Sequence, residues 1–181
     1  MCETFYTRMR ENSLIKDLNT RSFTDKQKEG LFTAIFIGAI FILIALIYVI
    51  HLPNSLWDSI VNFFSNLTLA QVPGTGIPLP APLNPAADID LYIAAFQFSV
   101  GIGVVEIIIL VLRSVLHSPV SRKAETIENI VFWLGTSYLI ITYLVKMVIA
   151  SEWFVFWAGL ILIFGLSLVA RAFVLLAKRQ T

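Results

Sequence analysis

The stretch from Leu91 to Arg113 constrains the fold more than any other part of the sequence. It reads LYIAAFQFSVGIGVVEIIILVLR, and a helix of about 20 apolar residues is long enough to cross the hydrocarbon of a bilayer. Glu106 lies well inside this apolar run, where a carboxylate costs free energy unless it is protonated, paired or facing water. Ser99, Gly103, Glu106 and Arg113 recur at helical spacing and therefore share one face of the predicted helix.

The composition assigns the whole chain to the membrane. Of the 181 residues, 57% are hydrophobic and 14% are charged, whereas soluble domains average about 45–50% and 25%. We therefore predict an all-α protein embedded in the bilayer of a cell or organelle membrane. The formal net charge of +1 gives no indication of a nucleic-acid partner.

Four apolar segments are predicted to span the bilayer. They cover residues 30–50, 91–116, 130–150 and 153–177. Residues 1–29 form a charged N-terminal segment, and residues 178–181 form a short tail. The pattern TDKQ at Thr24–Gln27 fits a capping box at the start of the first span. Ser118-Pro119 fits an N-cap followed by proline at the first helical position of the third helix.

Residues 51–90 form the one long loop, between the first two spans. Its first part, Asn54–Gln71, has apolar residues at helical spacing and predicts an amphipathic helix lying in the membrane interface, with Trp57 as an anchor. The alternative is a re-entrant pore helix followed by a filter-like VPGTG loop. Residues 72–90 contain five prolines and predict an extended cover. Asn66 begins a glycosylation sequon, Asn-Leu-Thr.

The cationic residues predict the orientation of the spans. Twelve of the 13 lysines and arginines fall in the N-terminal segment, around the second-to-third connection or near the C-terminus, and the loop 51–90 has none. By the positive-inside rule, both termini are cytoplasmic and the long loop faces outward. Lys146 is the exception, and we expect it near the outer end of the third span, as a surface residue or in an outer vestibule.

Glu106 and Arg171 are expected to lie at similar depth. Glu106 is about 22 Å along the helix from Leu91, and Arg171 is about 27 Å along the helix from Trp153. An ion pair between them, holding two helices together, is one hypothesis. The other is that Glu106 faces a hydrated path as a gate or an ion-coordinating carboxylate. Arg113 is expected to extend to the inner membrane surface.

Enzyme chemistry finds little support in the sequence. His51 and His117 lie at the ends of spans, Cys2 is the only cysteine, and no hydrolase, phosphate-loop or metal-ligand motif is present. We therefore expect no enzymatic activity, no cofactor and no metal.

Two functions remain open after these exclusions. The first is a homo-oligomeric, channel- or transporter-like conduit for ions or small solutes, because four spans are too few for a conduit through one copy. The second is a structural or accessory subunit that associates with partner membrane subunits through its small residues and outer loop. In a conduit, the face with Ser99, Gly103 and Glu106 meets other copies or water, and in an accessory subunit this face is occluded.

Overall fold

The computed structural model describes residues 25–52, 56–146 and 151–177 of the chain. The chain divides into two compact units, residues 1–35 and residues 36–181. Of the first unit, the described part is the start of helix α2 (Asp25–Ile50). The predicted capping box at Thr24 lies outside the described residues, although α2 does begin at the next residue.

Four helical segments in the described part of the chain are long and apolar enough to cross a membrane. They are α2, the segment formed by η2 (Pro85–Asp88) with α4 (Ile89–Val115), the segment formed by α5 (Val120–Leu139) with the π-helical turn η3 (Ile140–Leu144), and α6 (Ser151–Ala177). The prediction is confirmed in its coarser part: the described chain is mostly helical, with four helical segments long and apolar enough to span a membrane.

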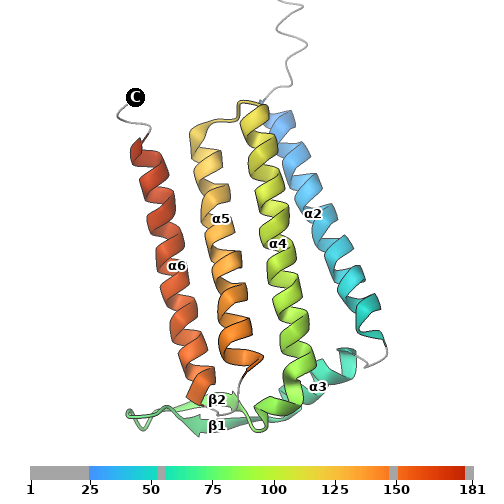
Figure 1. The fold of residues 1–181 in the computed structure, drawn as a ribbon, viewed down its shortest axis with the longest axis vertical. Helices are drawn as coiled ribbons and strands as arrows, with labels where there is room; N and C mark the ends of the chain where they lie inside the picture. The colour runs from blue at the N-terminus through green and yellow to red at the C-terminus, as the bar shows by residue number, and fades with distance from the viewer. Residues whose placement is uncertain (1–24, 53–55, 147–150, 178–181) are drawn as a thin grey trace, which may run out of the picture. The chain divides into compact units, whose positions relative to one another are not determined.

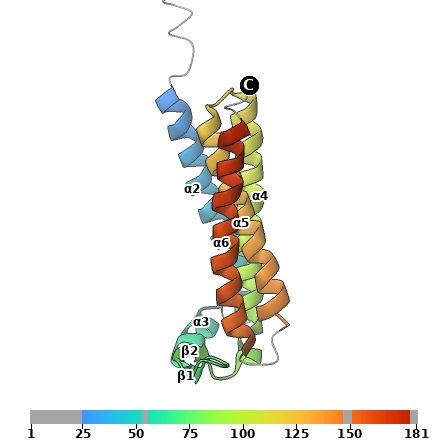
Figure 2. The ribbon, with the colours of Figure 1, turned by 90° about the vertical axis from the view of Figure 1, so that its left-hand side faces the viewer.

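Helices α4, α5 and α6 lie side by side in the second unit, with α5 in the middle (Figure 1). Seen from the side they overlap, so the three form one layer (Figure 2). Glycines make the close approach possible. A Cβ atom on Gly103 of α4 would lie 2.5 Å from Leu134 Cδ2 of α5, and one on Gly135 of α5 would lie 2.6 Å from Ile163 Cγ2 of α6.

The turn between α4 and α5 ends the first helix with paired backbone hydrogen bonds. The Ser118 amide donates to the Arg113 carbonyl at 2.9 Å, and the His117 amide donates to the Ser114 carbonyl at 3.3 Å. This is the Schellman pattern, which needs a left-handed residue directly after the helix cap. His117, with φ of 52°, supplies it.

The helical segments differ from the predicted spans at two boundaries. The third helix begins at Val120, directly after the predicted N-cap pattern at Ser118-Pro119 and therefore before the predicted span at residue 130. It ends in the η3 turn, where the Val145 amide donates to the Ile140 carbonyl at 2.9 Å. Ser151 and Glu152, predicted as a turn, are the first residues of α6. The end of the predicted third span, residues 147–150, lies outside the described residues.

The long loop contains a β-hairpin that the sequence analysis did not predict. Helix α3 (Leu56–Ser65) ends six residues before the predicted Gln71. Strand β1 (Leu67–Gln71) follows and pairs antiparallel with β2 (Pro78–Pro82). The VPGTG segment is the turn of this hairpin, with Gly74 and Gly76 at φ of 78° and 69°, so it does not form a filter.

The prolines of β2 are compatible with a strand because of their register. The Val72 amide donates to the Ile77 carbonyl at 2.9 Å, and the Leu83 amide donates to the Asn66 carbonyl at 3.0 Å. Odd-numbered residues of β2 therefore face the hydrogen-bonded positions of β1. Pro78, Pro80 and Pro82 fall on the positions between them, where an N–H would point away from the partner strand.

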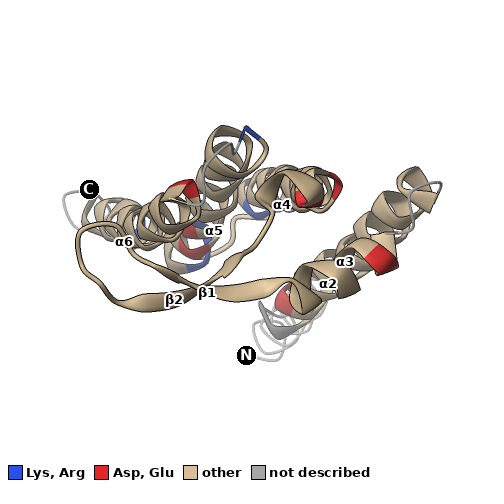
Figure 3. Cartoon of the chain, turned by 90° about the horizontal axis from the view of Figure 1, so that it is seen from below, with Lys and Arg blue, Asp and Glu red and all other residues tan. Residues whose placement is uncertain are grey.

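The apolar core of the second unit lies where the hairpin meets α4, α5 and α6. Its buried members are Ala81, Tyr92, Leu139, Ile140, Leu144, Trp153 and Phe156. The indole N–H of Trp153 donates to the Pro80 carbonyl at 3.0 Å, which fixes the hairpin to the first turn of α6. No charged residue lies on the hairpin (Figure 3). We call this end of the unit the hairpin end.

Candidate functional site

Polar groups of α4 and α5 lie along the contact between the two helices. We call this set the polar seam. It consists of the side chains of Ser99, Glu106 and Arg113 on α4, the side chains of Thr126 and Asn129 on α5, and the backbone carbonyl of Arg122 on α5. The α5 members follow one another at steps of four and three residues, which places them on one helical face.

Glu106 is closed off inside the polar seam. Glu106 is only 4% exposed. The Asn129 side-chain amide nitrogen donates to Glu106 Oε1 at 2.8 Å. A buried carboxylate needs such a partner, because an unsatisfied polar group in an apolar environment costs several kcal/mol, about 2–7 depending on the reference state.

The predicted ion pair between Glu106 and Arg171 is wrong. Arg171 donates to Glu128 Oε2 at 2.9 Å. The reason is the order of the helices in the layer: α5 lies between α4 and α6, so both groups meet α5. Their partners, Glu128 and Asn129, are adjacent residues, and the predicted similarity in depth therefore holds.

Arg113 is bound by α5 at the other end of the polar seam. Its Nη1 donates to the Arg122 carbonyl at 2.7 Å and to Thr126 Oγ1 at 2.6 Å. The Thr126 hydroxyl in turn donates to the Arg122 carbonyl at 3.0 Å. These contacts join α4 to the first turns of α5, and the extension of Arg113 to the membrane surface stays a prediction.

Ser99 and Gly103 complete the occluded face of α4. Ser99 is 3% exposed, and its hydroxyl donates to the Ala95 carbonyl one turn earlier at 2.9 Å. Leu134 of α5 covers Gly103. The face that a conduit would turn toward other copies or water is thus packed against α5 of the same chain.

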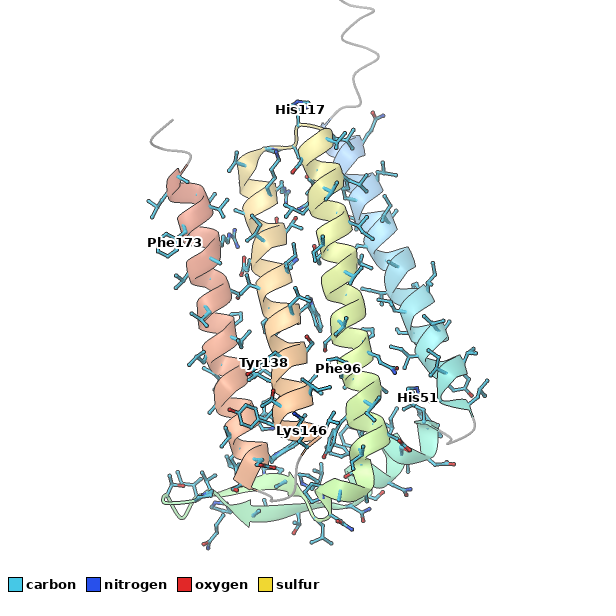
Figure 4. The ribbon with its side chains drawn as sticks, viewed as in Figure 1. His51, Phe96, His117, Tyr138, Lys146 and Phe173 are labelled. Atoms are coloured by element: carbon cyan, nitrogen blue, oxygen red, sulfur yellow. The ribbon has the colours of Figure 1, made fainter. Side chains whose placement is uncertain are left out.

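The remaining candidates lie outside the polar seam. Lys146 is exposed just after η3, at the hairpin end (Figure 4). Asn66 is exposed between α3 and β1, and its glycosylation stays a prediction. His51 and His117 lie at opposite ends of the second unit (Figure 4). Over the described ranges, no group of three or more potential metal ligands comes together.

Sequence reasoning missed the α5 half of the polar seam. The N-cap pattern at Ser118-Pro119 already places Thr126, Glu128 and Asn129 in the third helix, but they precede the apolar run that begins at Ile130 and were not considered as partners of α4. The usable signal was their position on this helix. Helical spacing then places Arg122, Thr126 and Asn129 on one face.

The contact between Arg171 and Glu128 should contribute little to stability. Arg171 is 44% exposed at the side chain, and exposed ion pairs contribute about 0.2–1 kcal/mol. We expect Arg171→Gln to lower the free energy of unfolding in detergent by no more than about 1 kcal/mol. A loss of about 3 kcal/mol, the cost of breaking a buried pair, would contradict this assignment.

Comparisons with known proteins found no matching family model, no matching curated protein and no matching solved structure.

Proposed function

We propose that this protein is an accessory subunit of a larger membrane assembly and that it binds its partner through the hairpin end. The observation that carries the proposal is the exposed surface of the hairpin. Leu69 and Leu83 are each 71% exposed and Ile77 is 56% exposed, on a segment without any charged residue. Leu69 lies on one face of the hairpin and Ile77 and Leu83 on the other, and apolar surface left exposed on a folded chain is a candidate for protein–protein or membrane contact.

The polar seam supports the same proposal. Glu106 and Arg113 are bonded to α5 within the chain, so they serve to hold α4 on α5. Hydrogen bonds between transmembrane helices contribute about 0.6–2 kcal/mol each. A subunit whose task is to present a surface needs this internal rigidity.

Some glycines of the apolar helices, Gly38 and Gly165 among them, remain open for a partner helix in the membrane. No atom lies within 4 Å of the position that a Cβ would take on Gly38 or Gly165. Gly101, by contrast, is covered by Leu43, and Gly159 by Leu139. Exposed small residues allow a second helix to approach closely.

The homo-oligomeric conduit stays a prediction. It would require the seam to open, so that Ser99 and Glu106 leave α5 and line a path between copies. The same purified protein tests both functions. A homo-oligomeric conduit conducts ions without any other chain, whereas an accessory subunit does not.

The experiment is purification in mild detergent, with mass measurement of the assembly and of its chains. We expect a defined ratio of this chain to a different membrane chain. The double variant Leu69→Lys/Leu83→Lys should release the partner while keeping the melting temperature, and Thr75→Lys at the hairpin turn is the matched control. A homo-oligomer that conducts ions in liposomes, or an assembly unaffected by the double variant, would contradict the proposal.

We also propose that the hairpin end faces outward and that the opposite end is cytoplasmic. Arg113, Arg122 and Arg171 all lie toward the end with the α4–α5 turn, and cytoplasmic ends carry the excess of cations. In a chain with Cys2→Ser, a cysteine at Thr75 should react with an impermeant thiol reagent on intact cells, and a cysteine at Ser121 should not. The reverse pattern would overturn this orientation.

A further inference from the structure

An apolar pocket lies between α3, the hairpin and the first turns of α6. Its volume is about 710 Å³, within the range of about 300–1,000 Å³ typical of ligand sites. Phe63 and Leu67 form one wall, Leu79 lies on the hairpin side, and Trp153 and Ala158 form the wall on α6. The pocket is separate from the polar seam.

The pocket continues into the exposed apolar surface of α6. Ile161, which lines it, is 73% exposed, and the exposed residues Phe164 and Leu168, three and seven positions further on, continue the same face of the helix. Because α6 is long and apolar enough to cross a membrane, this surface meets lipid chains when the helix is embedded. The pocket therefore extends a lipid-contacting surface to beneath the hairpin.

The chemistry of the residues that line the pocket determines which class of ligand it can bind. The residues that line the pocket are apolar apart from the indole N–H groups of Trp153 and Trp157, and the indole N–H of Trp153 is already donated to the Pro80 carbonyl. A protein segment entering the pocket would bring backbone N–H and C=O groups that need hydrogen-bond partners. A hydrocarbon chain brings no such groups.

We propose that this pocket holds one acyl chain of a membrane lipid, drawn out of the bilayer along α6 and covered by the hairpin. The bound chain fills the space between α6 and the hairpin that the side chains leave open. The lipid is selected by its hydrocarbon, and its headgroup remains at the pocket mouth.

The test reconstitutes the full chain in phosphatidylcholine vesicles that contain a small fraction of the same lipid with a photoreactive group at the end of one acyl chain. After illumination, labelled peptides are mapped by mass spectrometry. We expect label on the hairpin residues Leu67–Leu79 as well as on α6. Lipid that merely surrounds the protein would label the membrane-spanning helices and leave the hairpin unlabelled.

Two variants close the pocket from opposite sides. Ala158→Trp fills it from α6, and Leu79→Lys places a charge over it from the hairpin. Each variant should lower labelling of the hairpin about tenfold. This is the change in lipid affinity expected when roughly two methylene groups of the acyl chain no longer fit in the pocket. Ala172→Trp, at an exposed position on the far part of α6, is the matched control and should label normally.

Two results would overturn the proposal. The first is labelling confined to the membrane-spanning helices and equal in wild type and in both variants. The second is an unlabelled hairpin in a wild-type dimer that either variant converts to a monomer, because a second copy would then occupy the pocket. If Ala158→Trp fails to fold, hairpin labelling of Leu79→Lys still tests the proposal.

Discussion

Replacement of Trp153 by alanine is expected to lower the free energy of unfolding by about 3–5 kcal/mol, the usual cost of truncating a buried tryptophan. Trp153 is 8% exposed and packs on Phe63 and Phe156, with ring centroids at 5.9 and 6.3 Å. Its indole also holds the Pro80 carbonyl. Thermal unfolding in detergent measures the loss, and limited proteolysis should show earlier cleavage in the hairpin.

Two controls separate packing from hydrogen bonding at this position. Trp153→Phe keeps an aromatic ring but loses the hydrogen bond to Pro80. It should lower the free energy of unfolding by only about 1 kcal/mol. Trp157→Ala removes a neighbouring ring that is 48% exposed and should cost clearly less than Trp153→Ala. Equal losses for Trp153→Ala and Trp157→Ala would show that the hairpin is not fixed through Trp153.

The second large effect is expected in the polar seam. Glu106→Leu leaves the Asn129 amide without its acceptor and should cost about 1–3 kcal/mol, the penalty for an unsatisfied buried group. Asn129→Leu leaves the Glu106 carboxylate without its donor and should cost at least as much. The double variant removes both groups and should recover a coupling energy of about 1–2 kcal/mol.

A second cycle provides the control for this pair. Glu106→Leu combined with Arg171→Leu should be additive within about 0.5 kcal/mol, because the two residues share no partner. Strong coupling between Glu106 and Arg171, together with none between Glu106 and Asn129, would restore the ion pair that the sequence suggested and contradict the observed contact.

The spans were predictable because their signal is physical and local. A helix that crosses a bilayer needs about 20 apolar residues, and this pattern is readable without knowledge of neighbours. The boundaries of the third span were less accurate, because polar residues such as Thr126 and Asn129 are accommodated within a helix when a neighbouring helix supplies their partners.

The partner of Glu106 could not be predicted for a different reason. Depth along a helix follows from residue counting, and Glu106 and Arg171 do lie at similar levels. Which helix stands between two others is a property of the tertiary arrangement, and no spacing in the sequence encodes it. Because α5 lies between α4 and α6, Glu106 contacts Asn129 and Arg171 contacts Glu128, and the expected ion pair between Glu106 and Arg171 does not form.

The hairpin was missed because its signals conflict. Prolines disfavour strands, and Leu67–Gln71 continues the apolar spacing of α3. The alternation of Pro78, Pro80 and Pro82 was the available signal, since every second position in a two-stranded ribbon has its N–H directed away from the partner.

The most direct test of the account is the water accessibility of Ser99. In a chain with Cys2→Ser, a cysteine at Ser99 is nearly isosteric with the natural residue and should remain packed between α4 and α5. We predict that a small, water-soluble methanethiosulfonate reagent leaves this cysteine unmodified in liposomes, while a cysteine at Thr75 reacts fully. Modification of both cysteines at similar rates would show that the polar seam opens to water and would contradict the account.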